Sequence, residues 1–200
     1  SWMDVGVNVL LSRYTSSSSD TNAFFQAFVN PPVYNIYNDS NKVAYPEKFD
    51  SPQLYGFGNS YANPYAVARY NENSEKGTNL VFSTYAQLSL LDGKLKMKTS
   101  YNLDMQSYRT QGYVPEYFVG GSQGVSVSTL TKIYGLSDSH IIDNTITYTD
   151  LIGRHSFSVM AGQSTRIERF SAMNGSGINV PAYDSQSMYI SNGSNSGSLV

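Results

Sequence analysis

The sequence contains no cysteine, little charge and no long run of apolar residues. The lack of cysteine excludes a disulfide framework and thiolate chemistry. No stretch approaches the roughly 18 consecutive apolar residues that a membrane helix requires. Charged residues make up 14% of the chain, and the formal net charge is −2. This balance argues against nucleic-acid binding, which is typical of chains with a basic stripe.

Tyrosine, by contrast, is abundant. The chain has 17 tyrosines against nine phenylalanines and one tryptophan. Together with serine, asparagine and glycine, they favour exposed loops and strands with one solvent-facing side over a helical core. The chain opens SWMDVGVNVLL, without a basic leader, and closes SNGSNSGSLV, a loop-like run. We therefore expect a piece of a longer chain.

Asp92-Gly93 is the strongest local signal, because a type I′ hairpin turn needs positive φ at both central positions. With this turn, residues whose numbers sum to 185 face each other. The apolar face pairs Leu90 with Leu95, Leu88 with Met97, Ala86 with Thr99, Thr84 with Tyr101, Phe82 with Leu103 and Leu80 with Met105. The opposite face carries Lys96, Lys98, Asn102, Asp104 and Gln106. A slip of one residue would destroy this sorting.

Two other regions show the same alternation. Residues 3–13 alternate apolar with mostly polar side chains, and a second hairpin is predicted around Ile152-Gly153, with Tyr148 opposite Phe157. The expected strands lie near 3–13, 79–91, 94–107, 140–151 and 154–168, and the long polar connections near 14–78, 109–138 and 169–200. Short turns therefore alternate with long loops.

Alternation alone does not say which face meets water. In a soluble two-layer sheet the lysines face solvent, whereas in a membrane barrel the leucines face lipid and the lysines line a wet lumen. Strands of about 9–11 residues and asymmetric loop lengths favour the barrel. We predict an all-β, antiparallel transmembrane β-barrel with short periplasmic turns and long extracellular loops. The soluble β-domain stays an alternative.

Three segments carry a family resemblance. NPYAVARYNENSEKGTNLVFSTYAQLSLLDGKLKMKTSYNLD (63–104), NPPVYNIYND (30–39) and DNTITYTDLIGRHSFSVMAGQS (143–164) occur in that family's order. The chain resembles the barrel of the SusC-like (RagA-like) TonB-dependent transporters of Bacteroidetes outer membranes. Its turn, Leu91 to Leu95, is one residue off the commonest family spacing.

The resemblance implies part of a large plugged barrel of about 22 strands in the bacterial outer membrane. It also implies a SusD-like surface lipoprotein as lid, energy from the TonB complex, and a glycan or peptide as ligand. The plug and the N-terminal regions are expected outside this sequence. Two other hypotheses stay open: a soluble or cell-surface β-domain that binds glycan or protein, and a passive porin or adhesin barrel.

Motifs for chemistry are weak. Gly120 to Gly124 fits G-x-S-x-G, but a nucleophile elbow needs a strand before it and a helix after it. His140 and His155 are expected at opposite ends of a hairpin, where they cannot share a metal, and His155 is expected to pair with Asp150. The Asn-rich stretch 35–42 lacks the glycine turn of a calcium loop. We expect no catalytic residue, no metal site and no cofactor, so the chain is not expected to be an enzyme.

The loop tyrosines are the better candidates for ligand binding. Flat amphipathic rings among short amides suit sugars, and they suit protein partners equally. The alternative is that the rings pack the loops against one another. The candidate ligand-binding residues are Tyr34, Tyr37, Tyr45, Tyr55, Tyr61, Tyr65, Tyr113 and Tyr117.

Overall fold

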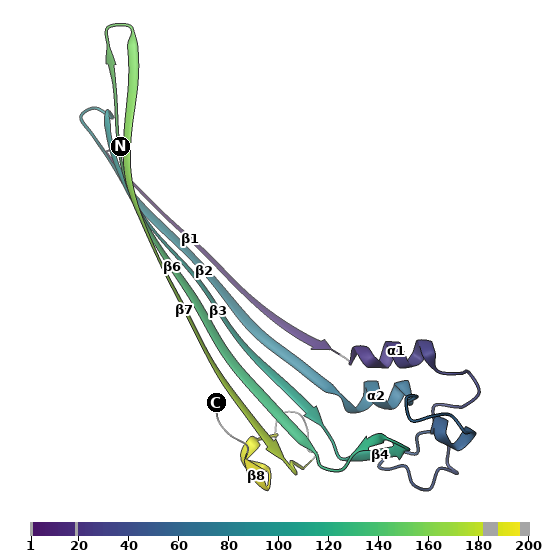
Figure 1. The fold of residues 1–200 in the computed structure, drawn as a ribbon. Helices are drawn as coiled ribbons and strands as arrows, with labels where there is room; N and C mark the ends of the chain where they lie inside the picture. Colours follow the sequence, from purple (N-terminus) through teal and green to yellow (C-terminus); the bar gives the residue numbers. More distant parts are fainter. Residues whose placement is uncertain (1, 19, 182–187, 197–200) are drawn as a thin grey trace. The chain divides into compact units, whose positions relative to one another are not determined.

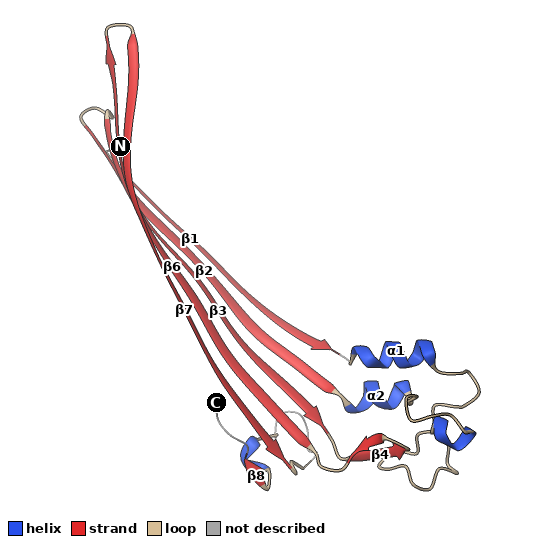
Figure 2. Ribbon diagram, viewed as in Figure 1, coloured by secondary structure: helices blue, strands red, loops and turns tan. Residues whose placement is uncertain are grey.

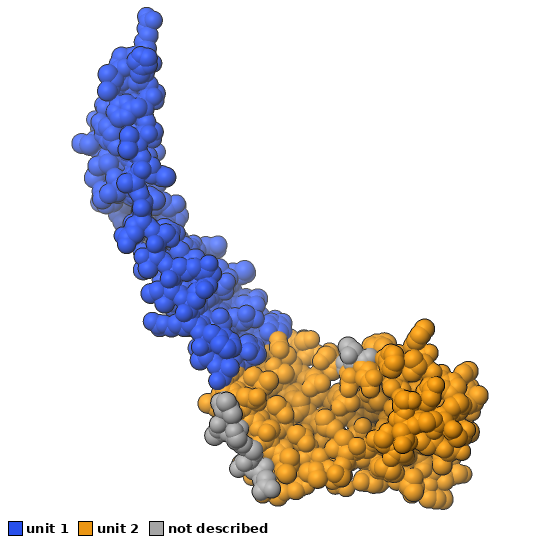
Figure 3. Space-filling view, viewed as in Figure 1, with its two compact units in different colours: residues 1–14, 77–108, 135–172 blue, residues 15–76, 109–134, 173–200 orange. Residues whose placement is uncertain are grey.

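The computed structural model describes residues 2–18, 20–181 and 188–196. These residues form two compact units, coloured separately in Figure 3. Unit 1 consists of Ser1–Tyr14, Gly77–Tyr108 and Gly135–Ala172, and unit 2 of Thr15–Lys76, Arg109–Tyr134 and Met173–Val200.

The main sheet has six strands in the order β1-β2-β3-β6-β7-β8 (Figures 1 and 2). Its members are β1 (Met3–Ser18), β2 (Glu72–Leu90), β3 (Leu95–Val114), β6 (Thr129–Ile152), β7 (His155–Ile178) and β8 (Asn195–Ser196). Successive long strands are neighbours in the sheet, so the path is an up-and-down meander. This order gives the antiparallel all-β architecture that the alternation predicts.

The turn between β2 and β3 contains Asp92-Gly93, both with positive φ (53° and 88°). The N–H of Lys94 donates to the carbonyl of Leu91 at 3.1 Å, which closes the turn, and Leu91 also has a positive φ of 53°. In unit 1 the hydroxyl of Ser83 donates to the Oδ1 of Asn102 at 2.8 Å. This contact agrees with the register derived from the turn.

The β6–β7 turn is one residue later than predicted. The strands end at Ile152 and begin at His155, so Gly153 (φ 63°) and Arg154 form the turn in place of Ile152-Gly153. The hydroxyl of Ser164 donates to Asp143 at 2.6 Å, which places paired residues at a sum of 307 rather than 305. A shift of two keeps every side chain on its predicted face.

The strands are longer than the sequence pattern indicates. The strands extend into each of the predicted long connections. β1 continues to Ser18, β2 begins at Glu72, β3 continues to Val114, β6 begins at Thr129 and β7 continues to Ile178. One added stretch, TSSS at 15–18, has polar side chains on both faces and so lacks hydrophobic alternation. The hydrogen bonds between strand backbones do not require such alternation.

Unit 1 has tyrosine rings lying over glycines on neighbouring strands. A Cβ added at Gly6 would meet the Tyr85 ring at 2.3 Å, and one added at Gly135 would meet the Tyr108 ring at 2.3 Å. Gly77 meets Tyr14 in the same way, at 2.2 Å. Over the described residues, the buried hydrophobic side chains all belong to unit 2. Unit 1 is therefore a sheet without a core of its own.

The predicted connections are folded in unit 2. The 14–78 connection contains α1 (Thr21–Val29), η1 (Pro52–Tyr55) and α2 (Pro64–Tyr70). The later connections contain the hairpin of β4 (Tyr117–Gly120) and β5 (Gln123–Val125), and η2 (Ile190–Asn192). The Oδ1 of Asn63 accepts the N–H groups of Tyr65 and Ala66 and caps α2, and Pro64 begins that helix without an N–H to satisfy. No described helix has the length and apolar character needed to cross a membrane.

Two hydrophobic cores hold unit 2 together. One contains Phe49, Ala66, Tyr70, Tyr117 and Val119. The other contains Tyr113, Leu130, Val180 and Met188. The segments of each core lie far apart in the sequence, so burial ties the connections to the ends of the strands.

Candidate functional site

Asp50 organises the tyrosine-bearing segment of unit 2. It is fully buried, and its Oδ2 accepts from the N–H of Asn35 at 3.1 Å and from the hydroxyl of Tyr55 at 2.8 Å. Its Oδ1 accepts from Asn38 and from the N–H of Ser51. A buried carboxylate with this many donors is satisfied and fixes the loop around it.

The ring of Tyr34 lies 6.2 Å from that of Tyr55, between centroids. Burial, followed by the nearby charge of Asp50, raises the pKa of Tyr34 to about 12. The hydrogen bond to Asp50, with some burial, raises the pKa of Tyr55 as well. Both phenols are therefore neutral at ordinary pH, and Tyr55 donates to Asp50.

Tyr37 and Tyr65 form a small aromatic platform over the core. Tyr37 stacks on Phe49 with a centroid distance of 4.9 Å, and Tyr65 meets Tyr37 edge-on at 6.0 Å. Both tyrosines are exposed, while Phe49 beneath them is fully buried. A fixed ring below two exposed rings holds them in place before any ligand arrives, which lowers the entropic cost of binding.

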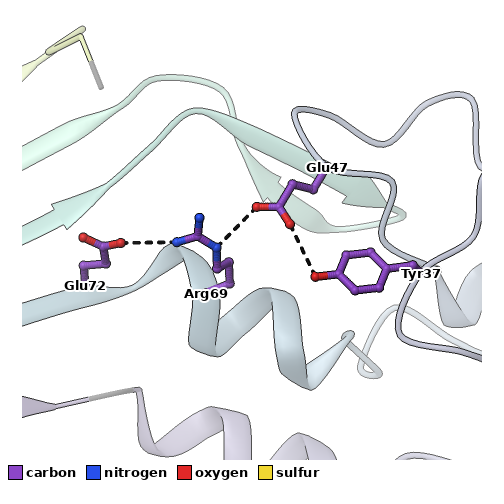
Figure 4. Close-up of polar contacts among 4 residues, drawn as sticks. All are labelled: Tyr37, Glu47, Arg69 and Glu72. Atoms are coloured by element: carbon purple, nitrogen blue, oxygen red, sulfur yellow. Dashed lines mark hydrogen bonds and ion pairs between the residues drawn. The ribbon is translucent and has the colours of Figure 1, made fainter. Parts of the chain in front are cut away.

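Charged groups extend this platform, as Figure 4 shows. The hydroxyl of Tyr37 donates to Glu47 at 3.5 Å, and Glu47 pairs with the Nε of Arg69 at 3.3 Å. Arg69 also meets Glu72 at 3.5 Å. No sequence pattern indicates these charged contacts, because Glu47 and Arg69 are 22 positions apart and match no motif.

The other candidate tyrosines have different surroundings. Tyr45 is exposed, and its hydroxyl donates to Glu116 at 3.2 Å. Tyr61 packs against Phe57. Tyr113 and Tyr117 are buried: the hydroxyl of Tyr113 donates to the carbonyl of Val180 at 3.3 Å, and the ring of Tyr117 lies 4.3 Å from that of Tyr70.

A ligand at the platform can therefore reach Tyr37 and Tyr65, while Tyr113 and Tyr117 pack the cores. Ligand binding by any of the eight tyrosines stays a prediction.

In unit 1 the predicted lumen-facing residues occupy alternate positions of β3. The hydroxyl of Ser83 donates to Asn102, and the Nζ of Lys98 lies 4.8 Å from the centroid of the Tyr85 ring. Lys96, Asp104 and Gln106 are exposed on the same strand. They share one face of the sheet, and the medium that this face meets stays a prediction.

The histidines and the G-x-S-x-G stretch form no catalytic array. Ser122 lies in the β4–β5 hairpin, and its hydroxyl donates to the carbonyl of Asn59 at 2.9 Å. His140 contacts Tyr101 and Asp138, each at 2.8 Å. The predicted pairing of His155 with Asp150 is wrong, because Lys94 takes that carboxylate at 2.7 Å. Within the described part of the chain, no three acidic or histidine side chains form a metal cluster.

The comparisons with known proteins found no matching family model and no matching curated protein. Solved structures do match. A chain from the RagAB peptide transporter is 15% identical, with a TM-score of 0.64 over 97% of this chain and 21% of that chain. A chain from the RagAB peptide importer in the 'open-open' state is 16% identical, with a TM-score of 0.68 over 100% of this chain and 22% of that chain. This chain thus spans about a fifth of those chains and shares the fold of that part.

Proposed function

We propose that this chain is a segment of an outer-membrane β-barrel that imports glycans or peptides. The observation that carries the proposal is the long antiparallel sheet of unit 1, with one apolar face, one polar face and no described core of its own. The fold likeness to chains of a peptide importer over 97–100% of this chain supports it. The rest of the barrel and a plug belong to other parts of the protein.

The apolar face of unit 1 is suited to hydrocarbon. Met3, Leu88, Met97 and Ile146, one from each of four neighbouring strands, line a shallow groove of about 330 Å³. Lipid would cover such side chains in a barrel, whereas a soluble sheet would need a second layer over them. The lysine-bearing face then lines the aqueous interior.

A SusD-like lipoprotein is the proposed partner of unit 2. Helix α1 turns a polar side chain inward and aromatic side chains outward. Gln26 is buried and donates to the carbonyl of Ser60, whereas Phe24 is 78% exposed and Phe28 is 89% exposed. A helix that turns phenylalanines outward is suited to an apolar groove on another protein. It carries no basic side chain in its last turn, unlike helices that lie on anionic lipid.

The aromatic platform is the proposed ligand contact. Its rings offer stacking area, and Glu47 and Arg69 offer an acceptor and donors for hydroxyl or amide groups. The described groups here bind and orient, and none of them is an activated nucleophile. Import energy would come from TonB through regions outside this chain.

Membrane placement is tested first. The full-length protein should sediment with outer membranes, need detergent for extraction, and show heat-modifiable electrophoretic mobility. Recovery in the soluble fraction would support the soluble β-domain and end the proposal. Uptake that persists in cells lacking TonB would support a passive barrel.

Ligand contact is tested with the double variant Tyr37→Ala/Tyr65→Ala. Two aromatic contacts contribute about 1–3 kcal/mol of binding free energy. Loss of both rings should therefore weaken uptake of the cognate ligand about tenfold or more. Tyr134→Ala removes another exposed ring and is the matched control. Equal uptake by the double variant and the control would exclude the platform as the ligand site.

A further inference from the structure

Tyrosine and glycine alternate across four neighbouring strands of unit 1. A Cβ added at Gly77 would meet the Tyr14 ring at 2.2 Å, and one added at Gly135 would meet the Tyr108 ring at 2.3 Å. The β2–β3 register places Gly77 directly opposite Tyr108. One row across β1, β2, β3 and β6 therefore reads Tyr14, Gly77, Tyr108 and Gly135, and it lies on the lysine-bearing face.

The two glycines let the tyrosine rings lie along the sheet. For both Tyr14 and Tyr108, the atoms nearest to the added Cβ are the outer ones of the side chain, Cε1, Cζ and the hydroxyl oxygen. A ring whose outer end lies over the next strand extends along the wall instead of standing away from it. Both side chains are half-buried, so part of each ring is left for another molecule to cover. Rings held in this way lose little entropy on binding.

Phe170 adds a third ring on β7. The β6–β7 register places it diagonally across from Gly135 on the same face, and its side chain is 68% exposed. In the strand order β1-β2-β3-β6-β7, the three rings belong to β1, β3 and β7, each two strands from the next. Neighbouring strands are about 4.8 Å apart, so the strands that carry the rings are about 10 Å apart. We call Tyr14, Tyr108 and Phe170 the aromatic strip.

The surroundings of the aromatic strip are polar and uncharged. The row of the two tyrosines ends on Ala172 of β7. Beside Phe170, the next row on the same face carries only hydroxyls and amides, from Ser12, Asn79, Gln106 and Ser137. Such groups donate to and accept from neutral hydroxyls. Charged side chains or termini of a ligand would find no ion-pair partner in these two rows.

A neutral chain of pyranose sugars matches this combination. The C–H groups on one face of a pyranose pack against an aromatic ring, while the hydroxyls at its rim need neutral hydrogen-bonding partners. In an extended oligosaccharide, alternate sugar units are about as far apart as alternate strands of a sheet. One sugar chain can therefore stack on successive rings of the aromatic strip.

We propose that the aromatic strip is a stacking site for a neutral oligosaccharide on the lysine-bearing face of unit 1. The inference rests on the proposed function, in which this face lines the aqueous interior, and it narrows the ligand to a neutral glycan. Tyr85 does not belong to the strip. Its ring also lies over a glycine of this face, Gly6, but the Nζ of Lys98 lies over that ring, 4.8 Å from its centroid.

The test measures binding to the full-length protein in nanodiscs by isothermal titration calorimetry. The probes are maltohexaose, cellohexaose and an acetylated, amidated hexapeptide of alanine and serine. Wild-type protein should bind at least one hexasaccharide more tightly than the peptide. Phe170→Ala, which removes an exposed ring, should weaken that binding about threefold, and Tyr14→Ala/Tyr108→Ala should weaken it about tenfold, as expected for one and two aromatic contacts.

Tyr85→Ala is the matched control, because it also removes a ring that lies over a glycine of the same face. It should change affinity less than twofold, and Tyr14→Phe/Tyr108→Phe, which keeps both rings, should bind as wild type does. An equal loss in Tyr85→Ala would assign the effect to the fold of the sheet and overturn the proposal.

Three other results also overturn it: no hexasaccharide binding by wild type, tighter binding of the peptide, or wild-type affinity in both Phe170→Ala and Tyr14→Ala/Tyr108→Ala. The sedimentation experiment keeps this failure apart from a failure of the proposed function. A protein that fractionates with outer membranes but binds no hexasaccharide loses the sugar site and keeps its proposed place in the membrane.

Discussion

Unit 1 and unit 2 differ in how far they bury their hydrophobic side chains. Unit 2 buries Phe49, Leu130 and Val180 almost completely, whereas the described hydrophobic side chains of unit 1 are all exposed or half-buried. Unit 2 can therefore be stabilised by its own packing. Unit 1 leaves apolar surface to whatever surrounds it, which is the behaviour expected of a sheet whose solvent on one side is lipid. The variants below separate these two sources of stability.

The largest effect is expected for Phe49→Ala in unit 2. Phe49 is fully buried and meets the Tyr70 ring at 5.5 Å, so truncation should cost about 3–5 kcal/mol. Limited proteolysis of the 30–70 segment measures it, with the exposed Phe24→Ala as control. Equal proteolysis of the two variants would show that this core does not hold the segment.

A smaller loss is expected for Leu103→Arg in unit 1. If its face meets hydrocarbon, a charge near the midplane should cost about 2–4 kcal/mol in urea titrations of folding into vesicles. Asn102→Arg, one residue along on the opposite face, should cost much less. Equal losses for the two would reverse or abolish the assignment of faces.

Gly135→Ala probes the polar face of the same sheet. The new Cβ would meet the Tyr108 ring at 2.3 Å, so the ring must move. The lost cross-strand contact should lower the free energy of unfolding by about 1 kcal/mol. Gly162→Ala is the milder control, because its new Cβ would come no closer than 3.3 Å to the Asn144 carbonyl oxygen on the neighbouring strand. The same urea titration compares them, and a larger loss for Gly162→Ala would show that ring packing over glycine is unimportant.

The smallest effect is expected on the stability of unit 2 at alkaline pH. Burial raises the pKa of both Tyr34 and Tyr70 to about 12 from 10.0. The unfolded chain therefore releases these protons first, so stability is intact below pH 10 and falls as pH rises toward 12. Phenolate absorbance should show a late step in folded protein that Tyr34→Phe/Tyr70→Phe lacks. An identical titration in the variant would place the late step elsewhere.

In unit 1 the β2–β3 register follows from the local sequence. The Asp92-Gly93 turn and the period-two alternation set the β2–β3 register, because both act between residues close in the chain. The weaker Gly153 turn left the β6–β7 pairing two positions off, since a shift by two keeps each residue on its face and the pattern cannot detect it.

Unit 2 depends instead on contacts between segments that are distant in the sequence. The contacts that build the platform join residues from separate segments, such as Tyr37 with Phe49 and Glu47 with Arg69. The fully buried Asp50 accepts from Asn35 and Tyr55 and fixes the segment between them. Which tyrosines remain exposed depends on how distant segments pack, and local propensity holds no information about it.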